Sequence, residues 1–135
     1  MNDNGPNPYV VNIEELTVAN DTFRTAIWTG KYLQTTVMSI AAGDDIGLEV
    51  HDDRDQFLRI EAGQAEVQMG PDKENLQSWQ AGDDYAIFVP AGAWHNVVNT
   101  GTEPLKVYSI YSPPEHAHGT VHATKAEAEA AEHGE

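Results

Sequence analysis

The sequence predicts one all-β domain, a sandwich or a barrel, and three observations lead to this fold class. The chain has 135 residues, enough for one domain with a sizeable core but too few for two. Between Phe23 and Tyr111, short runs of β-branched and aromatic residues alternate with turn residues. No helical periodicity separates these runs, which disfavours a βαβ fold with a parallel sheet.

The expected elements follow from the turn residues and the capping signals. Residues 1–9 are polar with two prolines and are expected to be a loose arm. Asn12 and Glu15 form a capping box, which predicts a short helix at about 13–18. Nine strands are then expected, at 23–29, 33–40, 47–51, 56–60, 64–69, 76–79, 85–89, 97–99 and 105–111.

The chain changes character again after Ser112-Pro113-Pro114. Thr124 and Glu127 form a second capping box, which opens an Ala/Glu-rich helix that ends near Glu132. This helix has no apolar stripe and is expected to be exposed or frayed. The predicted division is therefore an N-terminal arm with a short helix (1–22), a barrel (23–112) and a C-terminal tail with an acidic helix (113–135).

Charge and composition exclude several classes of function. The chain has 22 acidic and 7 basic residues, a formal net charge of −15. Non-specific nucleic-acid binding depends on Lys and Arg at phosphates, so no nucleic-acid partner is expected. Docking on anionic membranes is disfavoured for the same reason. Without cysteine, a metal must be held by nitrogen and oxygen ligands, for which six histidines are available: His51, His95, His116, His118, His122 and His133.

The N-terminus indicates the expected compartment. It lacks the basic start and apolar core of a signal peptide. The longest apolar stretch falls far short of the roughly 20 residues that span a bilayer. A cytoplasmic protein without a membrane partner is therefore expected. Its acidity has two explanations, a strongly hydrated surface that aids solubility or adaptation to high salt.

Candidate metal ligands lie in two segments, residues 47–63 and 90–99. His51 and Asp53 are two residues apart on an extended segment, so their side chains are expected to share a face. Gln56 has the parity of Leu58 in the next strand and faces inward if Leu58 lines the core.

His95 follows a Pro-Ala-Gly turn about 40 residues later, in phase with Val97. A barrel can bring such groups together in its mouth, where the small-ligand sites of these folds lie. Two imidazoles with a carboxylate or amide oxygen suit Zn, Fe, Ni, Cu or Mn.

The second segment resembles the second motif of the cupin superfamily. That motif is glycine, five residues, Pro-x-Gly, two residues, His, three residues, Asn. Pro90, Gly92, His95 and Asn99 match it, while Gly82 lies two residues too early for the leading glycine.

The first segment resembles the first cupin motif, which is glycine, five residues, His-x-His, three or four residues, Glu, six residues, Gly. In this comparison His51 stands at the first histidine, Asp53 at the second, and Gln56 at the glutamate. Gly63 keeps the final spacing, but the gap from Asp53 to Gln56 is one residue short. The resemblance covers about residues 33–111.

The resemblance implies a cupin double-stranded β-helix, a jelly-roll barrel, with a divalent metal ion such as Zn, Mn, Fe or Ni in its mouth. It also implies a homodimer that pairs through sheet edges. The chain looks like small single-domain bacterial cupins of the type called mannose-6-phosphate-isomerase-like. Cupins include isomerases, dioxygenases, decarboxylases, lyases and non-catalytic proteins, so the resemblance implies no single reaction.

Three functions remain open from the sequence. The leading one is a metal-dependent isomerase or dioxygenase acting on a small, uncharged or weakly polar substrate. The metal would be held by His51, Gln56 and His95, with Asp53 as a fourth ligand or a general base. The altered first motif favours an alternative, a non-catalytic module that binds a small ligand. The third is a mainly structural homodimer.

Two other groups of residues bear on the ligand. The cations near the barrel are Arg24, Lys31 and Arg59, and Arg59 has the wrong parity to face inward with Gln56. A phosphorylated sugar would be poorly served by so few cations. The tail histidines at 116, 118 and 122 are either solvated or part of a lid over the barrel mouth.

Overall fold

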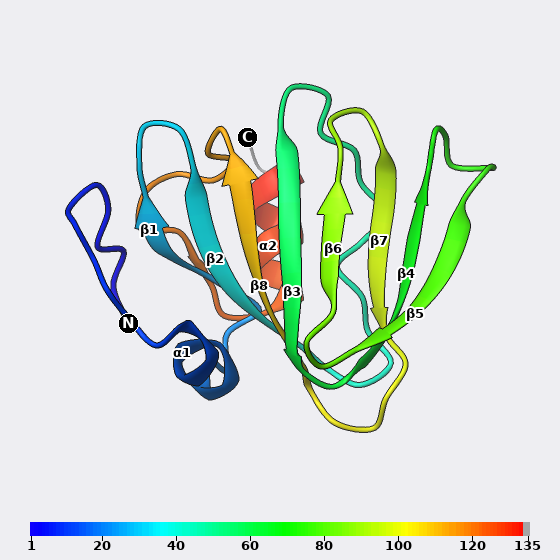
Figure 1. The fold of residues 1–135 in the computed structure, drawn as a ribbon, viewed down its shortest axis with the longest axis horizontal. Coiled ribbons are helices and arrows are strands. Elements are labelled where there is room, and N and C mark those ends of the chain that lie inside the picture. The colour runs from blue at the N-terminus through cyan, green and yellow to red at the C-terminus, as the bar shows by residue number, and fades with distance from the viewer. Residues whose placement is uncertain (134–135) are drawn as a thin grey trace.

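Two antiparallel sheets form the body of the protein in this computed structural model, which describes residues 1–133 (Figure 1). One sheet has the strand order β6-β3-β8-β2-β1-β9 and the other β5-β4-β7. The elements are α1 (Ile13–Ala19), β1 (Arg24–Thr29), β2 (Gln34–Ile40), β3 (Asp55–Ala62), β4 (Gln64–Gly70), β5 (Gln77–Gly82), β6 (Ala86–Val89), β7 (Trp94–Asn99), β8 (Leu105–Ser112), β9 (Val121–His122) and α2 (Lys125–His133).

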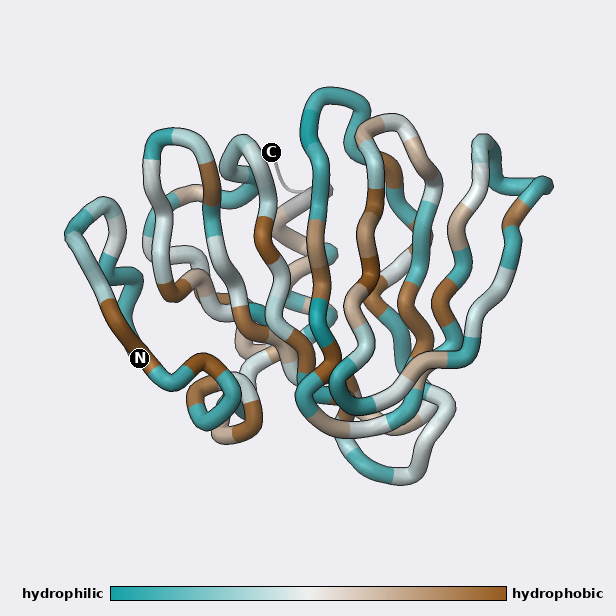
Figure 2. The backbone as a smooth tube through the Cα atoms, viewed as in Figure 1, coloured by the Kyte–Doolittle hydropathy of each residue, from teal (hydrophilic) through white to brown (hydrophobic). Residues whose placement is uncertain are grey.

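The core lies between the two sheets, as an all-β jelly roll requires. Burial alternates along β3 and β8, so every second side chain of these strands faces inward. Leu58 and Ile60 of β3 are fully buried, as are Leu105 and Val107 of β8. Figure 2 shows the matching alternation of apolar and polar segments along the strands. The all-β fold class predicted from the sequence is confirmed.

The segment 47–51 differs from the predicted strand. Gly47 adopts a φ of +93°, a left-handed conformation that interrupts extended backbone. Residues 45–49 instead make two isolated bridges to β7, Asp45 to Val98 and Glu49 to His95. The backbone amides of Glu49 and His95 each donate to the other residue's carbonyl, at 3.0 and 2.9 Å. Residues 45–51 are thereby fixed along one edge of β7.

Both ends of the chain pack on the barrel more closely than the sequence suggests. In the tail, β9 extends the large sheet by pairing with β1, with His122 opposite Arg24. Ala128 places one face of α2 against the core and is 4% exposed. At the N-terminus, Asp3 accepts hydrogen bonds from the Thr29 hydroxyl and from the Gly119 amide. Residues 1–9 are therefore attached to β1 and to the tail.

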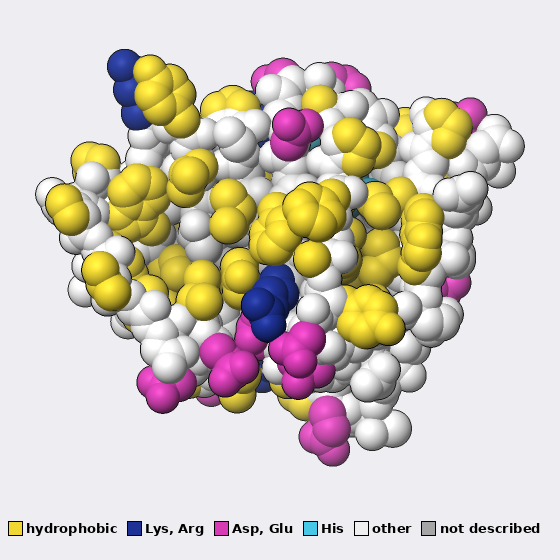
Figure 3. Space-filling view, viewed as in Figure 1, with side chains coloured by type: hydrophobic (Ala, Val, Ile, Leu, Met, Phe, Trp, Pro, Cys, Tyr) yellow, Lys and Arg dark blue, Asp and Glu magenta, His cyan; other side chains and the backbone are white. Residues whose placement is uncertain are grey.

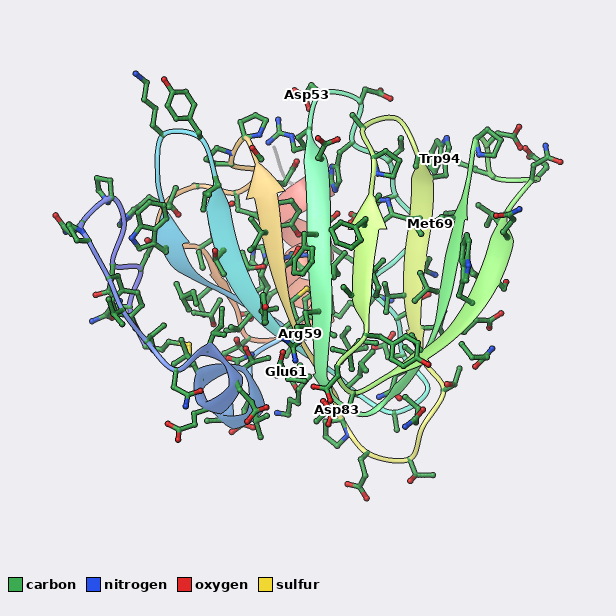
Figure 4. The ribbon with its side chains drawn as sticks, viewed as in Figure 1. Asp53, Arg59, Glu61, Met69, Asp83 and Trp94 are labelled. Atoms are coloured by element: carbon green, nitrogen blue, oxygen red, sulfur yellow. The ribbon has the colours of Figure 1, made fainter. Side chains whose placement is uncertain are left out.

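The outer surface carries apolar patches and paired charges. Figure 3 shows apolar side chains spread over the face in view, with acidic side chains along its lower edge. Arg59 ion-pairs with Glu61 and Asp84, each at 2.9 Å, at the end of β3 far from Asp53 (Figure 4). Within residues 1–133, no helix has both the length and the apolar composition needed to cross a membrane.

Candidate metal centre

Glu49, His51 and His95 converge at one end of the barrel. Their donor atoms all lie within 4.8 Å of one another. Glu49 Oε1 is 3.4 Å from His51 Nε2 and 3.4 Å from His95 Nε2. Two ligand atoms that each lie about 2.1 Å from one tetrahedral ion are themselves about 3.4 Å apart. The spacing of the three groups therefore suits a single ion.

Each imidazole is oriented through its other ring nitrogen. His51 Nδ1 lies 3.2 Å from a carboxylate oxygen of Glu115, and His95 Nδ1 lies 3.1 Å from the carbonyl oxygen of Ala93. Both acceptors assign the Nδ1 proton to their histidine, which leaves the Nε2 lone pairs directed at Glu49. Metal-binding histidines are held in this way in proteins.

Both Nε2 atoms are buried and have no hydrogen-bond partner among the described residues. Buried polar atoms in proteins are nearly always hydrogen-bonded, so two unpartnered nitrogens facing one carboxylate need an explanation. A bound cation supplies one, because it would accept both lone pairs and pair with Glu49. The donor set, two imidazole nitrogens and a carboxylate oxygen, fits a divalent metal.

The charges of the group are coupled. Burial raises the pKa of Glu49, but the contacts with His51 and His95 outweigh it and lower that pKa to about 2. Burial lowers the pKa of His51, but Glu115 and Glu49 outweigh it and raise that pKa to about 9. A proton on His51 thus occupies the position that a metal ion would take.

Gln56 faces the same interior from β3. It is 3% exposed, and its amide nitrogen donates to Ser109 Oγ at 2.9 Å. Its Oε1 is buried and has no hydrogen-bond partner in the described part of the chain. Gln56 lies opposite Tyr111 in the β3–β8 register, and the Tyr111 ring packs edge-on against His51. This oxygen is available as a neutral fourth donor.

Asp53 does not join the group. Its side chain is 73% exposed, and both of its carboxylate oxygens bond to Arg54. Figure 4 shows Asp53 at the tip of the loop that leads into β3. The chain turns at residues 52–53, so the face-sharing expected from His51 does not extend to Asp53. The structure therefore corrects the expected position of Asp53, which here is a solvated loop acid.

The residue that sequence reasoning missed is Glu49. It lies two residues before His51, on the other side from Asp53, and the same parity argument applies to it. If the two histidine positions of the first cupin motif are aligned with Glu49 and His51 instead of His51 and Asp53, the one-residue deficit before Gln56 disappears. The spacing then runs from Gly43 over five residues to Glu49-x-His51, over four to Gln56, and over six to Gly63. The motif spacing is therefore the signal in the sequence that identifies Glu49.

The tail supplies the partner of His51. Gln34 Oε1 accepts the backbone amides of Glu115 and His116 at 3.2 and 2.8 Å, and its amide nitrogen donates to the His116 carbonyl at 2.8 Å. The Glu115 carboxylate then lies between His51 Nδ1 and Arg54 Nε, each at 3.2 Å. Residues 115–116 are thus held beside the metal centre by a fully buried glutamine.

Comparison with known proteins decides the family. The family model described as cupin domain matches residues 36–111, more than half of the chain. The chain belongs to the cupin family. This cupin is 59% identical over 133 residues to the uncharacterized protein YrkC of Bacillus subtilis (strain 168), a match that spans 98% of this chain and 72% of YrkC. It is 40% identical over 114 residues to the uncharacterized protein L612 of Acanthamoeba polyphaga mimivirus, spanning 84% of this chain and 70% of L612.

A solved structure agrees closely with this cupin. The crystal structure of BH2720 from Bacillus halodurans aligns with a TM-score of 0.96 at 60% identity, covering 96% of this chain and 99% of that one. The names of these three relatives describe no reaction. The function of the cupin centre must therefore be inferred from its chemistry.

Proposed function

We propose that this cupin is a metal-dependent enzyme of the dioxygenase type, acting on a small molecule in the barrel mouth. The observation that carries the proposal is the pair of buried, unpartnered Nε2 atoms of His51 and His95, both facing Glu49. Two histidines and one carboxylate are the donor set typical of non-haem iron(II) oxygenases. This donor set favours oxygen chemistry over isomerisation.

The residues present fit a divalent ion in charge as well as in donor type. Glu49 would contribute the one negative charge, the two Nε2 atoms would donate their lone pairs, and Gln56 Oε1 would be a neutral fourth donor. A ligand set of this size leaves coordination positions for substrate and dioxygen. When bound, iron(II) would supply the electron transfer that makes dioxygen reactive.

The surrounding residues orient the donors and limit access of water. Glu115 and the Ala93 carbonyl hold the two imidazoles in the metal-binding tautomer. Tyr111 is 1% exposed, and burial raises the pKa of its phenol, so the group stays protonated beside His51. His95 is also 1% exposed, so bulk water is excluded from this side of the centre.

A second candidate function is a non-catalytic module that binds a small ligand. Gln56 favours it, because the cupin motif has a glutamate at this position and a neutral amide binds a cation more weakly. The two candidates differ in whether the protein binds a metal with open coordination positions.

Metal analysis tests the proposal. The protein is purified without added metal and analysed for bound elements, before and after anaerobic loading with Fe(II), Mn(II), Ni(II) or Zn(II). The proposal expects about one metal per chain in the wild type and in the control His118→Ala, since the His118 side chain is 55% exposed and bonds to the N-terminal arm. The double variant His51→Ala/His95→Ala should retain none.

Nitric oxide then tests the dioxygenase assignment. It stands in for dioxygen and binds iron(II) only where a coordination position is open. The iron-loaded protein should give the half-integer-spin paramagnetic resonance signal of an iron–nitrosyl complex. Retention of iron without this signal would contradict the dioxygenase proposal. Failure of the wild type to retain any of the four metals would overturn the metal-dependent enzyme and favour the binding module.

A further inference from the structure

Arg24 is a buried cation without a counterion. It lies on β1, is 5% exposed, and has no carboxylate within ion-pair distance among the described side chains, residues 1–131. Its Nη1 lies 3.1 Å from His122 Nδ1, and its guanidinium carbon lies 5.3 Å from the centre of the Phe23 ring. Its Nε is buried and has no hydrogen-bond partner in the same part of the chain. Burying an unpaired charge is costly, so this arrangement needs an explanation.

The strand register places Arg24 on the inner wall of the barrel. Ala26 pairs with Thr36, and Thr36 pairs with Ser109, the residue that holds the Gln56 amide. Directly paired residues share a face of the sheet, and so do residues two apart on a strand. Arg24 therefore lies on the same face as Gln56, the face that carries the metal centre.

A row of rings connects the metal centre with Arg24. Tyr111 packs against His51 with ring centroids 6.0 Å apart and against His116 with centroids 5.3 Å apart. His116 in turn lies 6.2 Å from His122, which contacts Arg24. His116 Nε2 is a further buried atom without a hydrogen-bond partner among the described residues. The side chains between the metal centre and Arg24 are thus in continuous contact. His116 and Arg24 each carry a buried nitrogen without a hydrogen-bond partner among the described residues.

The uncharged groups on this wall can act as hydrogen-bond donors. Burial, assisted by the Arg24 guanidinium, lowers the pKa of His116 to about 3, so this imidazole is neutral and carries one N–H. Tyr111, two residues from Ser109 on β8, carries its hydroxyl-bearing side chain on the same inner face. A guanidinium beside neutral donors is complementary to an anion.

We propose that Arg24 and His116 form an anion site on the inner wall beside the metal centre, and that it takes the carboxylate group of a small organic acid. The planar fork of a guanidinium matches a carboxylate, and one cation suits a single negative charge. Glu49 and Glu115 both interact electrostatically with His116, and their negative charges disfavour a phosphate dianion more than a singly charged carboxylate. The inference revises the expectation of an uncharged substrate, and its identification of the substrate class rests on the proposed function.

Calorimetric titration with acetate, glycolate and inorganic phosphate tests the site, on the metal-free protein and on the zinc-loaded protein. Arg24→Gln removes the charge, while the control Arg59→Gln makes the same change at the far end of β3. The wild type and Arg59→Gln should bind acetate and glycolate alike. Arg24→Gln should bind them about tenfold more weakly or not at all, a loss of about 1.4 kcal/mol or more. The zinc content of Arg24→Gln should equal that of the wild type.

Two further variants keep the test decisive if Arg24→Gln does not fold. Arg24→Lys keeps the charge without the planar fork, and His116→Phe keeps the packing on Tyr111 without the N–H; both should weaken acetate binding. Unchanged binding in all the folded variants would overturn the inference, as would a wild type that binds no carboxylate. Tighter binding of phosphate than of acetate would overturn the carboxylate assignment.

The metal-free arm separates this inference from the proposed function. Arg24-dependent binding of acetate to metal-free protein supports the anion site even if metal loading fails. Normal zinc loading without any binding of acetate or glycolate overturns the anion site and leaves the metal centre standing.

Discussion

Glu49 carries the charge that distinguishes this centre from a neutral polar cluster. Relative to the cupin motif, a glutamate replaces the first histidine and a glutamine replaces the glutamate. The two exchanges cancel in formal charge, so the proposed ligand set still carries −1. Two backbone hydrogen bonds hold Glu49 in place, since the amide of Glu49 donates to the His95 carbonyl and the amide of His95 donates to the Glu49 carbonyl.

Glu49→Gln and Asp53→Asn form a matched pair at the residue scale. Glu49→Gln keeps the shape of the side chain but removes the charge between the two imidazoles, and the affinity for zinc should fall by about tenfold or more. Asp53→Asn changes an exposed loop acid and should alter this affinity by less than about twofold. Competition with a chromophoric chelator measures both. A larger loss in Asp53→Asn than in Glu49→Gln would contradict the ligand set.

The stability of the metal-free protein should depend on pH through His51. Its pKa rises from 6.5 to about 9 on folding, so the contacts of the charged imidazole with Glu115 and Glu49 stabilise fully below about pH 6.5 and are lost as the pH rises through about 9. The pKa of Glu49 falls from 4.5 to about 2, so its contribution is present above about pH 4.5 and is lost as the pH falls through about 2.

The unfolding midpoint of the metal-free protein should therefore fall by roughly 3–6 °C between pH 6.5 and pH 9. Zinc takes the place of the proton on His51, so the zinc-loaded protein should lose less over the same range. Glu115→Gln should weaken the dependence, because it removes one of the two carboxylates that hold the proton. Scanning calorimetry at fixed ionic strength measures all three, and an identical pH dependence in Glu115→Gln would refute the role of that contact.

At the residue scale, the sequence predicts the two histidines and Gln56 but not the carboxylate between them. His95 lies on a regular strand, so parity and motif spacing locate it together. Asp53 and Glu49 have equal spacing from His51, and parity alone does not choose between them. The turn at residues 52–53 directs Asp53 away from His51 and leaves Glu49 beside it. Where this turn begins depends on the tertiary contacts of residues 45–51 with β7.

At the element scale, the tail residues 115–116 depend on one buried side chain. Gln34 uses both ends of its amide on their backbone and is 0% exposed. Gln34→Leu would leave the backbone groups of the tail without partners, at a cost of about 1–3 kcal/mol in unfolding free energy. The exposed Gln80 of β5 is the matched control, and Gln80→Leu should cost less than about 0.5 kcal/mol.

Urea unfolding measures the unfolding free energy of both variants, and amide hydrogen exchange shows which segments lose protection. Gln34→Leu should speed exchange at the amides of Glu115 and His116 while exchange in β3 stays slow. It should also accelerate zinc loss, because Glu115 would no longer hold His51. Unchanged zinc release with a loosened tail would show that the tail does not support the centre.

The elements themselves divide into those that local pattern predicts and those that pairing decides. Eight of the nine expected strands occur close to their predicted ranges, because alternation and turn residues act locally. Residues 47–51 have strand composition, but Gly47 interrupts the ladder. Only two residues long, β9 forms because β1 offers it an edge, and no local signal in Val121–His122 predicts that.

At the scale of the whole molecule, the net charge of −15 acts on stability. Repulsion among the acidic side chains destabilises the folded state, and salt screens it. The unfolding midpoint should rise by roughly 3–6 °C between about 0.02 M and about 0.5 M NaCl. Arg24→Gln is the control for chloride bound at Arg24, and it should show most of the same rise. No rise in either protein would contradict a role for repulsion and disfavour adaptation to high salt.

The proposed function depends on one divalent ion bound by Glu49, His51 and His95. Crystals of the zinc-loaded protein, measured on both sides of the zinc absorption edge, test it most directly. We expect one strong anomalous peak, about 2.0–2.2 Å from both Nε2 atoms and from a Glu49 carboxylate oxygen. No peak between these three residues, or a zinc ion at the exposed loop acids Asp52 and Asp53 instead, would contradict it.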